Sequence, residues 1–530
     1  MSSVVRAPRS HARYTTSLTR LRRLTNNAHN SRSTNLRSGV TDSAASPVAY
    51  RDLRQWLEGI NELGELKIVR GVDWDREMGA MVEMCYRRRA SKTAALLFDE
   101  IPGYAAGYRC LYGMMCSPRR FAYTIGGIDV SEVDSTMKYL KRYRDRMKDV
   151  QYIPPTDVKS SRVFENVLEG AAVDVFRLPV PIHHELDGGR YIGTACAVIT
   201  RDPDTGWINA GTYRVQVVEP NVGMCYISPG KHGRLHRDKY FARGQPCPAV
   251  AVVGIDPLLF LAARYPVPPG LSELDWVGGL REQPLEVLRG PYTGLPIPAN
   301  SEIVLEGEFR HDEKRLEGPF GEWPGYYAGG KVEEPVFRIK RMMFRDDPIL
   351  TCAASNKPPH SHLYERAFIR SAALWEGLEK AAVPDIHGVW VHEAGSGRTF
   401  NVVSICQKYY GHSRQAGILA SQMVPVAYGN RWTIVVDEDI DPSNLSEVVW
   451  AMGTRCDPKD DLEVMKKCWS SKIDPLTFDE KYYNSRVVVD ACKPYEHRDD
   501  FSPVAETSPE LKAKMLAKYP KQFREILGEL

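Results

Sequence analysis

Residues 161–347 carry the pattern that constrains the fold most, because five apolar segments with the two-residue period of β-strands follow one another there. Glycine and proline residues separate these segments frequently. We therefore predict an antiparallel, barrel-like sheet in this region, and not an array of βαβ units. The five segments are Ala195–Thr200, Tyr213–Val218, Ala249–Val253, Glu302–Phe309 and Pro335–Lys340.

A chain of 530 residues is too long for one ordinary core, so we expect further domains on both sides of this sheet. Residues 48–160 combine a helical spacing of apolar residues at Tyr50–Ile60, a buried strand at Ala94–Phe98 and a charged helical segment at Ser131–Met147. This mixture predicts a small N-terminal α/β domain.

Residues 348–497 alternate helices with strands, which predicts a parallel α/β layer. We expect Asp441 to cap one helix with Pro442 in its first turn, and no calcium loop, because the required glycine and terminal glutamate spacing are missing. In residues 498–530, a capped helix that begins at Ser508 fits docking or oligomer formation. The other predicted elements are helices Arg366–Ala381, Gly417–Val424 and Asn444–Met452 and strands Val389–Val391 and Thr433–Val436.

Composition excludes several classes of protein. A net charge of +3, with 43% hydrophobic and 26% charged residues, is typical of a soluble globular protein and gives no reason to expect nucleic-acid binding. No apolar run approaches the roughly 18 residues that a membrane span needs. The 11 cysteines contain no C-x-x-C motif, which favours reduced thiols in an intracellular compartment.

Residues 1–47 form a basic arm that we exclude from the fold. Eight arginines and no acid precede Asp42, a composition typical of a mitochondrial transit peptide. A disordered extension or an over-long gene prediction explains the same composition equally well. The expected location is therefore cytoplasmic or mitochondrial.

Two carboxylates, Glu317 and Glu322, flank a bend that contains Gly318, Pro319 and Gly321. These residues favour a turn that brings both acids to one space, where one would hold its proton and the other stay ionised. Taken alone, such acids are more often solvated ends of a surface turn.

A second motif, about a hundred residues upstream, makes an active-site role for the two acids more plausible than a solvated surface turn. It runs Asn209-Ala-Gly-Thr-Tyr-Arg214-Val-Gln-Val and is followed by Gly230-Lys-His232 and by Leu271-Ser-Glu273. Together with Glu317-Gly-Pro-Phe-Gly-Glu322, these motifs resemble the UbiD family of prenylated-flavin-dependent decarboxylases, in the same order, from about residue 48 to about residue 500.

The resemblance implies a fold, a cofactor and roles for these residues. The fold is a multidomain one of mixed α/β and β type, with a central split β-barrel that binds prenylated FMN (prFMN). Arg214, Glu317 and Glu322 match the catalytic network, and Asn209, His232 and Glu273 match ligands of Mn²⁺ or Mg²⁺, accompanied by K⁺, which hold the flavin phosphate. The implied cofactor-binding residues are Thr194, Asn209, Gly211, Thr212, Tyr213, Arg214, Lys231, His232, Glu273, Trp323 and Arg431, the last at a position where many relatives carry lysine.

The resemblance also implies the reaction, a reversible, non-oxidative decarboxylation of an aromatic acid. Glu322 is the expected proton donor, and Glu317 and Arg214 are expected to set its pKa and to position the substrate. The stretch after Glu322 is similar to the hydroxybenzoate branch, so a substrate such as protocatechuate is expected, with cinnamic, ferulic and heteroaryl acids as alternatives. Trp323 would provide a flat wall for a ring. His360 or His362 would form a hydrogen bond to a phenol, or else cap a helix or face solvent.

Other functions remain open from the sequence. A split-barrel flavin oxidoreductase needs neither the paired acids nor the metal. A two-carboxylate hydrolase would work without flavin, and an inactive flavin-binding subunit would retain the fold alone. The expected partners are a small aromatic acid, further copies of the chain and a flavin prenyltransferase that supplies the cofactor.

Overall fold

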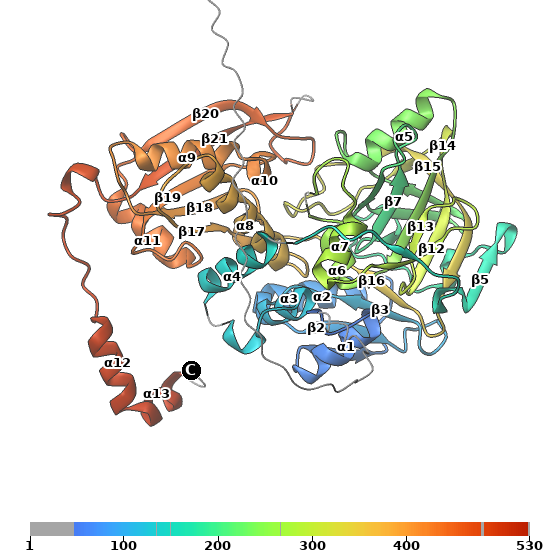
Figure 1. Ribbon diagram of the computed structural model, residues 1–530, viewed down its shortest axis with the longest axis horizontal. Helices are drawn as coiled ribbons and strands as arrows, with labels where there is room; N and C mark the ends of the chain where they lie inside the picture. The colour runs from blue at the N-terminus through green and yellow to red at the C-terminus, as the bar shows by residue number, and fades with distance from the viewer. Residues whose placement is uncertain (1–46, 134, 149, 266, 479–481, 528–530) are drawn as a thin grey trace, which may run out of the picture. The chain divides into compact units, whose positions relative to one another are not determined.

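The fold is described from a computed structural model, shown in Figure 1, which covers residues 47–133, 135–148, 150–265, 267–478 and 482–527. The predicted basic arm at 1–47 lies outside these residues, except for its last position.

The central sheet joins nine strands in the order β6-β9-β10-β15-β14-β11-β7-β8, with β5 paired to β15. Every pairing in it is antiparallel, which confirms the prediction from the period of two. Many of its apolar residues, Val250 and Val304 among them, have no exposed surface. The strands are β5 (Asn166–Glu169), β6 (Arg190–Gly193), β7 (Ala197–Arg201), β8 (Ile208–Gly211), β9 (Val215–Glu219), β10 (Val222–Cys225), β11 (Cys247–Gly254), β14 (Ile303–Glu317) and β15 (Val332–Phe344).

Three helices accompany the central sheet, and two of them begin at predicted site residues. These are α5 (His232–Ala242), α6 (Pro257–Ala262) and α7 (Glu273–Arg281). Strand β14 is longer than predicted, because its pairing with β15 continues past a bulge to Glu317 opposite Val332. Glu317 is therefore the last residue of a strand, and the bend starts only at Gly318.

The N-terminal sheet has the order β1-β2-β3-β16. Its fourth strand, β16 (Ile349–Cys352), comes from beyond the predicted boundary at residue 347 and pairs in parallel with β3. A small additional sheet contains β4 (Thr156–Asp157), β12 (Glu286–Arg289) and β13 (Pro296–Pro298). The other elements are α1 (Leu53–Glu62), β1 (Leu66–Arg70), α2 (Glu77–Arg89), β2 (Ala95–Asp99), β3 (Arg109–Tyr112), α3 (Pro118–Ile125) and α4 (Thr136–Lys148).

The C-terminal sheet has the order β17-β18-β19-β21-β20 and is mixed, so the prediction of a parallel layer is only partly correct. The pairs β18–β19 and β19–β21 are parallel, whereas both edge pairs are antiparallel. The connection between β17 and β18 is too short for the crossover that a parallel pair needs. The strands are β17 (Ile386–Val391), β18 (Phe400–Ile405), β19 (Trp432–Asp437), β20 (Leu462–Trp469) and β21 (Tyr483–Ala491).

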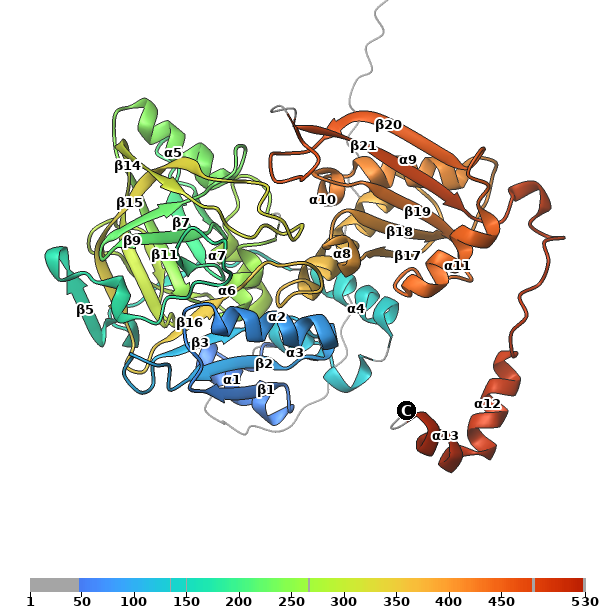
Figure 2. The ribbon, with the colours of Figure 1, turned by 180° about the vertical axis from the view of Figure 1, so that it is seen from behind.

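Helices cover both faces of this sheet, as Figure 2 allows the reader to follow. Ile434 and Val436 pack with residues of α11, whereas Val435 between them packs with residues of α9, because successive side chains of a strand point to opposite faces. The helices are α8 (Tyr364–Lys380), α9 (His412–Gln422), α10 (Val424–Ala427) and α11 (Leu445–Arg455).

The predicted cap of α11 is wrong. The side chain of Asn444, not of Asp441, caps the helix by accepting a hydrogen bond from the Ser446 amide at 3.1 Å. Asp441 instead accepts one from the Ser443 amide at 2.8 Å, a local turn that delays the start of the helix.

At the C-terminal end, Ser508 caps α12 (Pro509–Lys518) as predicted, and α13 (Pro520–Leu527) follows. Among the described helices, none combines the length and apolar character needed to cross a bilayer. All 11 cysteines are free thiols, as expected.

Candidate active site

Arg214 connects the two carboxylates that the sequence singles out. Its Nε and Nη2 atoms donate to Oε1 and Oε2 of Glu317, both at 2.7 Å, and its Nη1 donates to Oε1 of Glu322. Glu317 has no exposed surface and Glu322 only 9%. The structure thus brings the three predicted catalytic residues into one buried network, from β14, the following bend and the residue before β9.

The charge of Arg214 is secured by this arrangement. Burial lowers the pKa of the guanidinium, but Glu322 and Glu317 outweigh burial and raise it above its ordinary value. The guanidinium also lies 4.6 Å from the ring centre of Tyr226 and 5.3 Å from that of Phe320. Arg214 is therefore a permanent cation with a defined orientation.

Two residues that sequence reasoning missed hold the network in place. Tyr191 donates its hydroxyl hydrogen to Oε1 of Glu317 at 3.0 Å. Gln216 accepts from the Gly318 amide and donates to the Gly188 carbonyl, both at 2.9 Å. A signal for Gln216 was present in the sequence, since it is a polar residue in an apolar strand, two positions from Arg214.

The bend and the loop before β6 each require a glycine where they meet. Gly318 has a φ of +89°, and a Cβ there would lie 2.5 Å from the Gly330 carbonyl oxygen. A Cβ at Gly188 would lie 2.0 Å from the carbonyl oxygen of Gly318. Only glycine allows these two loops to approach so closely.

The predicted metal ligands lie at the ends of three elements that hydrogen bonds draw together. The Ala210 amide, next to Asn209 in β8, donates to Oε2 of Glu273 at 2.7 Å. The Tyr213 hydroxyl accepts from Nδ2 of Asn209 at 3.4 Å and from the Gly233 amide, beside His232, at 3.2 Å.

The chemistry of this set fits a divalent cation. Burial raises the pKa of Glu273 to about 7, and no Lys or Arg of the described residues pairs with its carboxylate. Burial, with a smaller effect of Lys231, lowers the pKa of His232, which favours the neutral form that binds metals. Among the described residues, no group of three or more His, Cys, Asp and Glu could hold a metal ion, so a site that includes Glu273 and His232 would need an amide donor such as that of Asn209.

The other predicted cofactor-binding residues have various surroundings. Thr194 accepts from the Ala353 amide at 2.9 Å, and Thr212 donates to the Cys196 carbonyl at 3.0 Å. Gly211 leaves no room for a side chain, because a Cβ would lie 2.4 Å from the Tyr213 ring. Lys231 is exposed, whereas the ring of Trp323 lies against Arg398 of the C-terminal region, with 5.3 Å between the guanidinium and the ring centre.

Arg431 is already paired. Its Nη2 atom donates to both carboxylate oxygens of Asp474 at 2.7 Å. The contact of Arg431 with the flavin phosphate stays a prediction, and in this structure Asp474 neutralises the charge that it would need.

The segment Asn356–His362 packs against the bend and carries unsatisfied polar atoms. A Cβ at Gly325 would lie 2.8 Å from Cα of Lys357. Both ring nitrogens of His360 and both amide atoms of Asn356 are buried without a partner among the described residues. Burial lowers the pKa of His360 and of His362 well below the ordinary value, so both imidazoles are neutral. They can recognise an O–H or N–H group on a bound ring.

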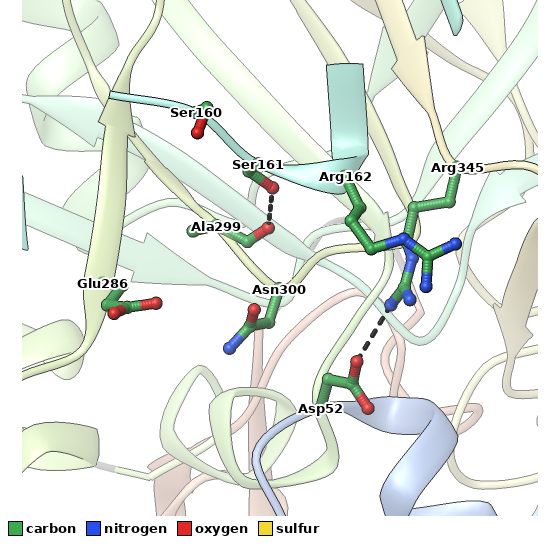
Figure 3. Close-up of a pocket in the computed structure, with 8 residues that line it drawn as sticks. All are labelled: Asp52, Ser160, Ser161, Arg162, Glu286, Ala299, Asn300 and Arg345. Atoms are coloured by element: carbon green, nitrogen blue, oxygen red, sulfur yellow. Dashed lines mark hydrogen bonds and ion pairs between the residues drawn. The ribbon is translucent and has the colours of Figure 1, made fainter. Parts of the chain in front are cut away.

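The cavity in Figure 3, about 150 Å³, lies apart from this network. Nη1 of Arg345, a lining residue, donates to Asp52 at 3.0 Å and to Glu302, which does not line the cavity, at 2.9 Å, so the charge of Arg345 is compensated. A larger cavity of about 470 Å³ borders His236 and Trp207. The lining of neither cavity includes a predicted site residue.

Comparison with known proteins gives a consistent result. Three family models match, described as the N-terminal domain of 3-octaprenyl-4-hydroxybenzoate carboxy-lyase over residues 57–142, its Rift-related domain over 156–358 and its C-terminal domain over 364–491. A pyrrole-2-carboxylic acid decarboxylase of Pseudomonas aeruginosa is 33% identical over 77% of this chain and 84% of its own length. A phenolic acid decarboxylase of Streptomyces sp. is 30% identical over 87% and 97%.

Solved structures agree with these matches. The UbiD-class enzyme HmfF from Pelotomaculum thermopropionicum, in complex with FMN, has a TM-score of 0.77 and 27% identity, and the match covers 88% of this chain and 100% of HmfF. An evolved dimeric form of HmfF in complex with prFMN has a TM-score of 0.74 and 27% identity, with 89% and 100% covered.

Proposed function

This chain belongs to the UbiD family of carboxy-lyases, and on that premise we propose that it is a prFMN-dependent decarboxylase of an aromatic or heteroaromatic acid. The observation that carries the proposal is the buried network in which one guanidinium, that of Arg214, binds both Glu317 and Glu322. Such a network places a fixed cation next to a carboxyl group that can exchange a proton.

The cofactor would be held through its phosphate and a divalent cation. Asn209, His232 and Glu273 would bind Mn²⁺ or Mg²⁺, and the raised pKa of Glu273 at about 7 supports a cation as its missing partner. K⁺ is part of the same proposal. When bound, prFMN supplies the electron sink that accepts the electron pair left when CO₂ departs.

The residues of the chain would bind the acid and move the proton. Arg214 orients the substrate carboxylate, since a guanidinium suits carboxylate contacts. Glu322 delivers a proton to the ring carbon that has lost CO₂, so the product is the arene and the Glu322 carboxylate, which takes a new proton from water. Glu317, held by Tyr191 and by two bonds from Arg214, keeps the guanidinium oriented.

The ring is proposed to carry a hydrogen-bond donor. Neutral His360 and His362, next to the bend, could accept from the hydroxyl groups of a hydroxybenzoate such as protocatechuate. A heteroaryl acid is the second candidate, because one 33% identical relative is named a pyrrole-2-carboxylic acid decarboxylase. A cinnamic or ferulic acid is a third. We also propose that the protein forms homo-oligomers and depends on a flavin prenyltransferase.

Co-expression with a flavin prenyltransferase tests the proposal. Protocatechuate, 4-hydroxybenzoate, pyrrole-2-carboxylate and cinnamate would be screened for CO₂ release, and the wild type should react with at least one. Glu322→Gln should lose most turnover and still bind flavin. NAD(P)H oxidation with no CO₂ release would indicate a flavin oxidoreductase instead, and flavin binding with neither reaction would indicate an inactive subunit.

A further inference from the structure

Three arginines of the C-terminal region meet beside the candidate site, and we call Arg366, Arg370 and Arg398 the arginine cluster. Arg366 and Arg370 lie one turn apart on α8, and Arg398 precedes β18. All three meet the turn at Gly397: Nη1 of Arg370 donates to the Gly397 carbonyl at 2.7 Å, and a Cβ on Gly397 would lie 3.2 Å from Cγ of Arg366.

The cluster has no acidic partner among the described residues. None of its members forms an ion pair within 4.0 Å with a carboxylate in the part of the chain that the structure describes. The nearby Glu365 binds Arg264 instead. The cations of the cluster are therefore not neutralised by the protein.

Most of its hydrogen-bond donors are also unused. A guanidinium has five N–H groups. Arg370 and Arg398 each donate to one backbone carbonyl, that of Gly397 at 2.7 Å and that of Tyr428 at 2.9 Å, and Arg366 donates to no described residue. The Nε atom of Arg398 is buried and has no partner among the described residues.

The cluster borders the bend that carries Glu322. The guanidinium of Arg398 lies 5.3 Å from the ring centre of Trp323 and 4.9 Å from that of Tyr428. Burial, followed by the repulsion of neighbouring arginines, lowers the pKa of Arg366 to about 9, although Glu322 acts in the opposite direction. The three arginines are half-buried, and like charges held close together in this way are stabilised when an anion binds between them.

We propose that the arginine cluster is an oxyanion-binding site. It binds an anionic group of a molecule at the candidate active site, and this group is not the carboxylate that is lost as CO₂. The inference rests on the proposed function. Two sources supply such a group: the phosphate of the flavin, or a second carboxylate on the substrate. Planar guanidinium groups suit both, because each offers paired N–H donors.

Calorimetric titration of the purified full chain distinguishes the sources. FMN is compared with riboflavin, which lacks the phosphate, and isophthalate with benzoate, which has one carboxylate fewer. The wild type should prefer the more highly charged member of at least one pair. The double variant Arg366→Gln, Arg370→Gln should lose that preference by about tenfold or more, as expected for the loss of charge-assisted hydrogen bonds.

Control variants keep the test decisive. Arg310→Gln removes a guanidinium that is paired with Glu308 and Asp312 elsewhere on β14, and it should keep the wild-type preferences. Arg370→Lys keeps the positive charge and should therefore keep part of the wild-type preference that the double variant loses. If the wild type lacks both preferences, or the double variant keeps them, the oxyanion site is wrong. A wild type that binds no flavin contradicts the proposed function, and the isophthalate and benzoate pair still tests the cluster.

Discussion

The ammonium group of Lys472 lies 4.7 Å from the centre of the Tyr226 ring, on which the guanidinium of Arg214 also rests at 4.6 Å. Lys472 follows β20 in the C-terminal region, so this region contributes a cation to the network formed by the central sheet. The Lys472 ammonium is attracted by the carboxylates of Glu334, Glu322 and Glu317 and repelled by the guanidinium of Arg214.

Lys472→Met should therefore lower activity and change its pH dependence. Burial lowers the pKa of Lys472 below the ordinary 10.5, so the wild type should lose the ammonium, and with it activity, at a lower pH than an ordinary lysine would. We expect kcat/KM of Lys472→Met to fall about tenfold at neutral pH, as expected for one lost charge contact. The decrease of kcat/KM at alkaline pH should disappear in Lys472→Met.

Profiles of kcat/KM from pH 6 to 10 measure this, with Lys472→Arg as the control that keeps the charge. An unchanged alkaline decrease in Lys472→Met would show that Lys472 is not the titrating group.

Arg214→Lys should disable the network although it keeps the charge. A lysine cannot make the two parallel bonds of 2.7 Å to Glu317 and also reach Glu322. We expect a loss of kcat/KM of about 100-fold or more, and a decrease in the free energy of unfolding of a few kcal/mol, on the order of that for other disrupted buried ion pairs. Steady-state kinetics and urea unfolding measure both. Arg310→Lys is the matched control, and equal effects in the two variants would contradict the role of Arg214.

Gly318→Ala should displace the two acids. The substitution adds a Cβ 2.5 Å from the Gly330 carbonyl oxygen at a φ of +89°, so it introduces both a steric clash and backbone strain. Gly206→Ala separates the two effects, because Gly206 has a φ of +76° and nothing within 4 Å of the added Cβ. We expect both variants to lose about 1 kcal/mol or more of unfolding free energy from strain. Only Gly318→Ala should lose activity. Full turnover in Gly318→Ala would show that the acids tolerate movement of the bend.

Acid should destabilise the fold through buried histidines. Burial lowers the pKa of His183 to about 3 and those of His236 and His392 to about 4. Their pKa values in the unfolded chain are near 6.5, so the unfolded state binds more protons below that pH. Their contribution to stability is thus complete above pH 6.5 and decreases as the pH falls toward 4.

Urea unfolding at pH 7, 6 and 5 measures this slope. Each such histidine contributes up to about 1.4 kcal/mol per pH unit below its unfolded pKa. His236→Gln should make the slope shallower, whereas His497→Gln, at an exposed position, should not. Equal slopes in all three proteins would contradict the assignment.

Much of the fold was predictable because it depends on local pattern. The period of two predicts the strands of the central sheet, and Ser508 predicts the start of α12. The glycine and proline residues between Glu317 and Glu322 predict a bend, but only the resemblance of the motifs to the UbiD family implied that both acids meet at Arg214. The same local reasoning failed at Asp441. Asp441 and Asn444 are both residues that can cap a helix, and the backbone conformation of the loop places Asn444, not Asp441, at the N-cap of α11.

Contacts between distant residues were decided by the tertiary structure alone. Arg431 and Asp474 are 43 positions apart, and no sequence pattern indicates that one would neutralise the other. Neither does a pattern indicate that Lys472 reaches Tyr226, or that Arg366, Arg370 and Arg398 form no ion pair with a described acid. Sequence therefore determined which strands, helices and polar motifs form, since these depend on neighbours along the chain. Which charges are paired depends on how the sheets and their loops pack, because the energy of a charge is set by its surroundings in space.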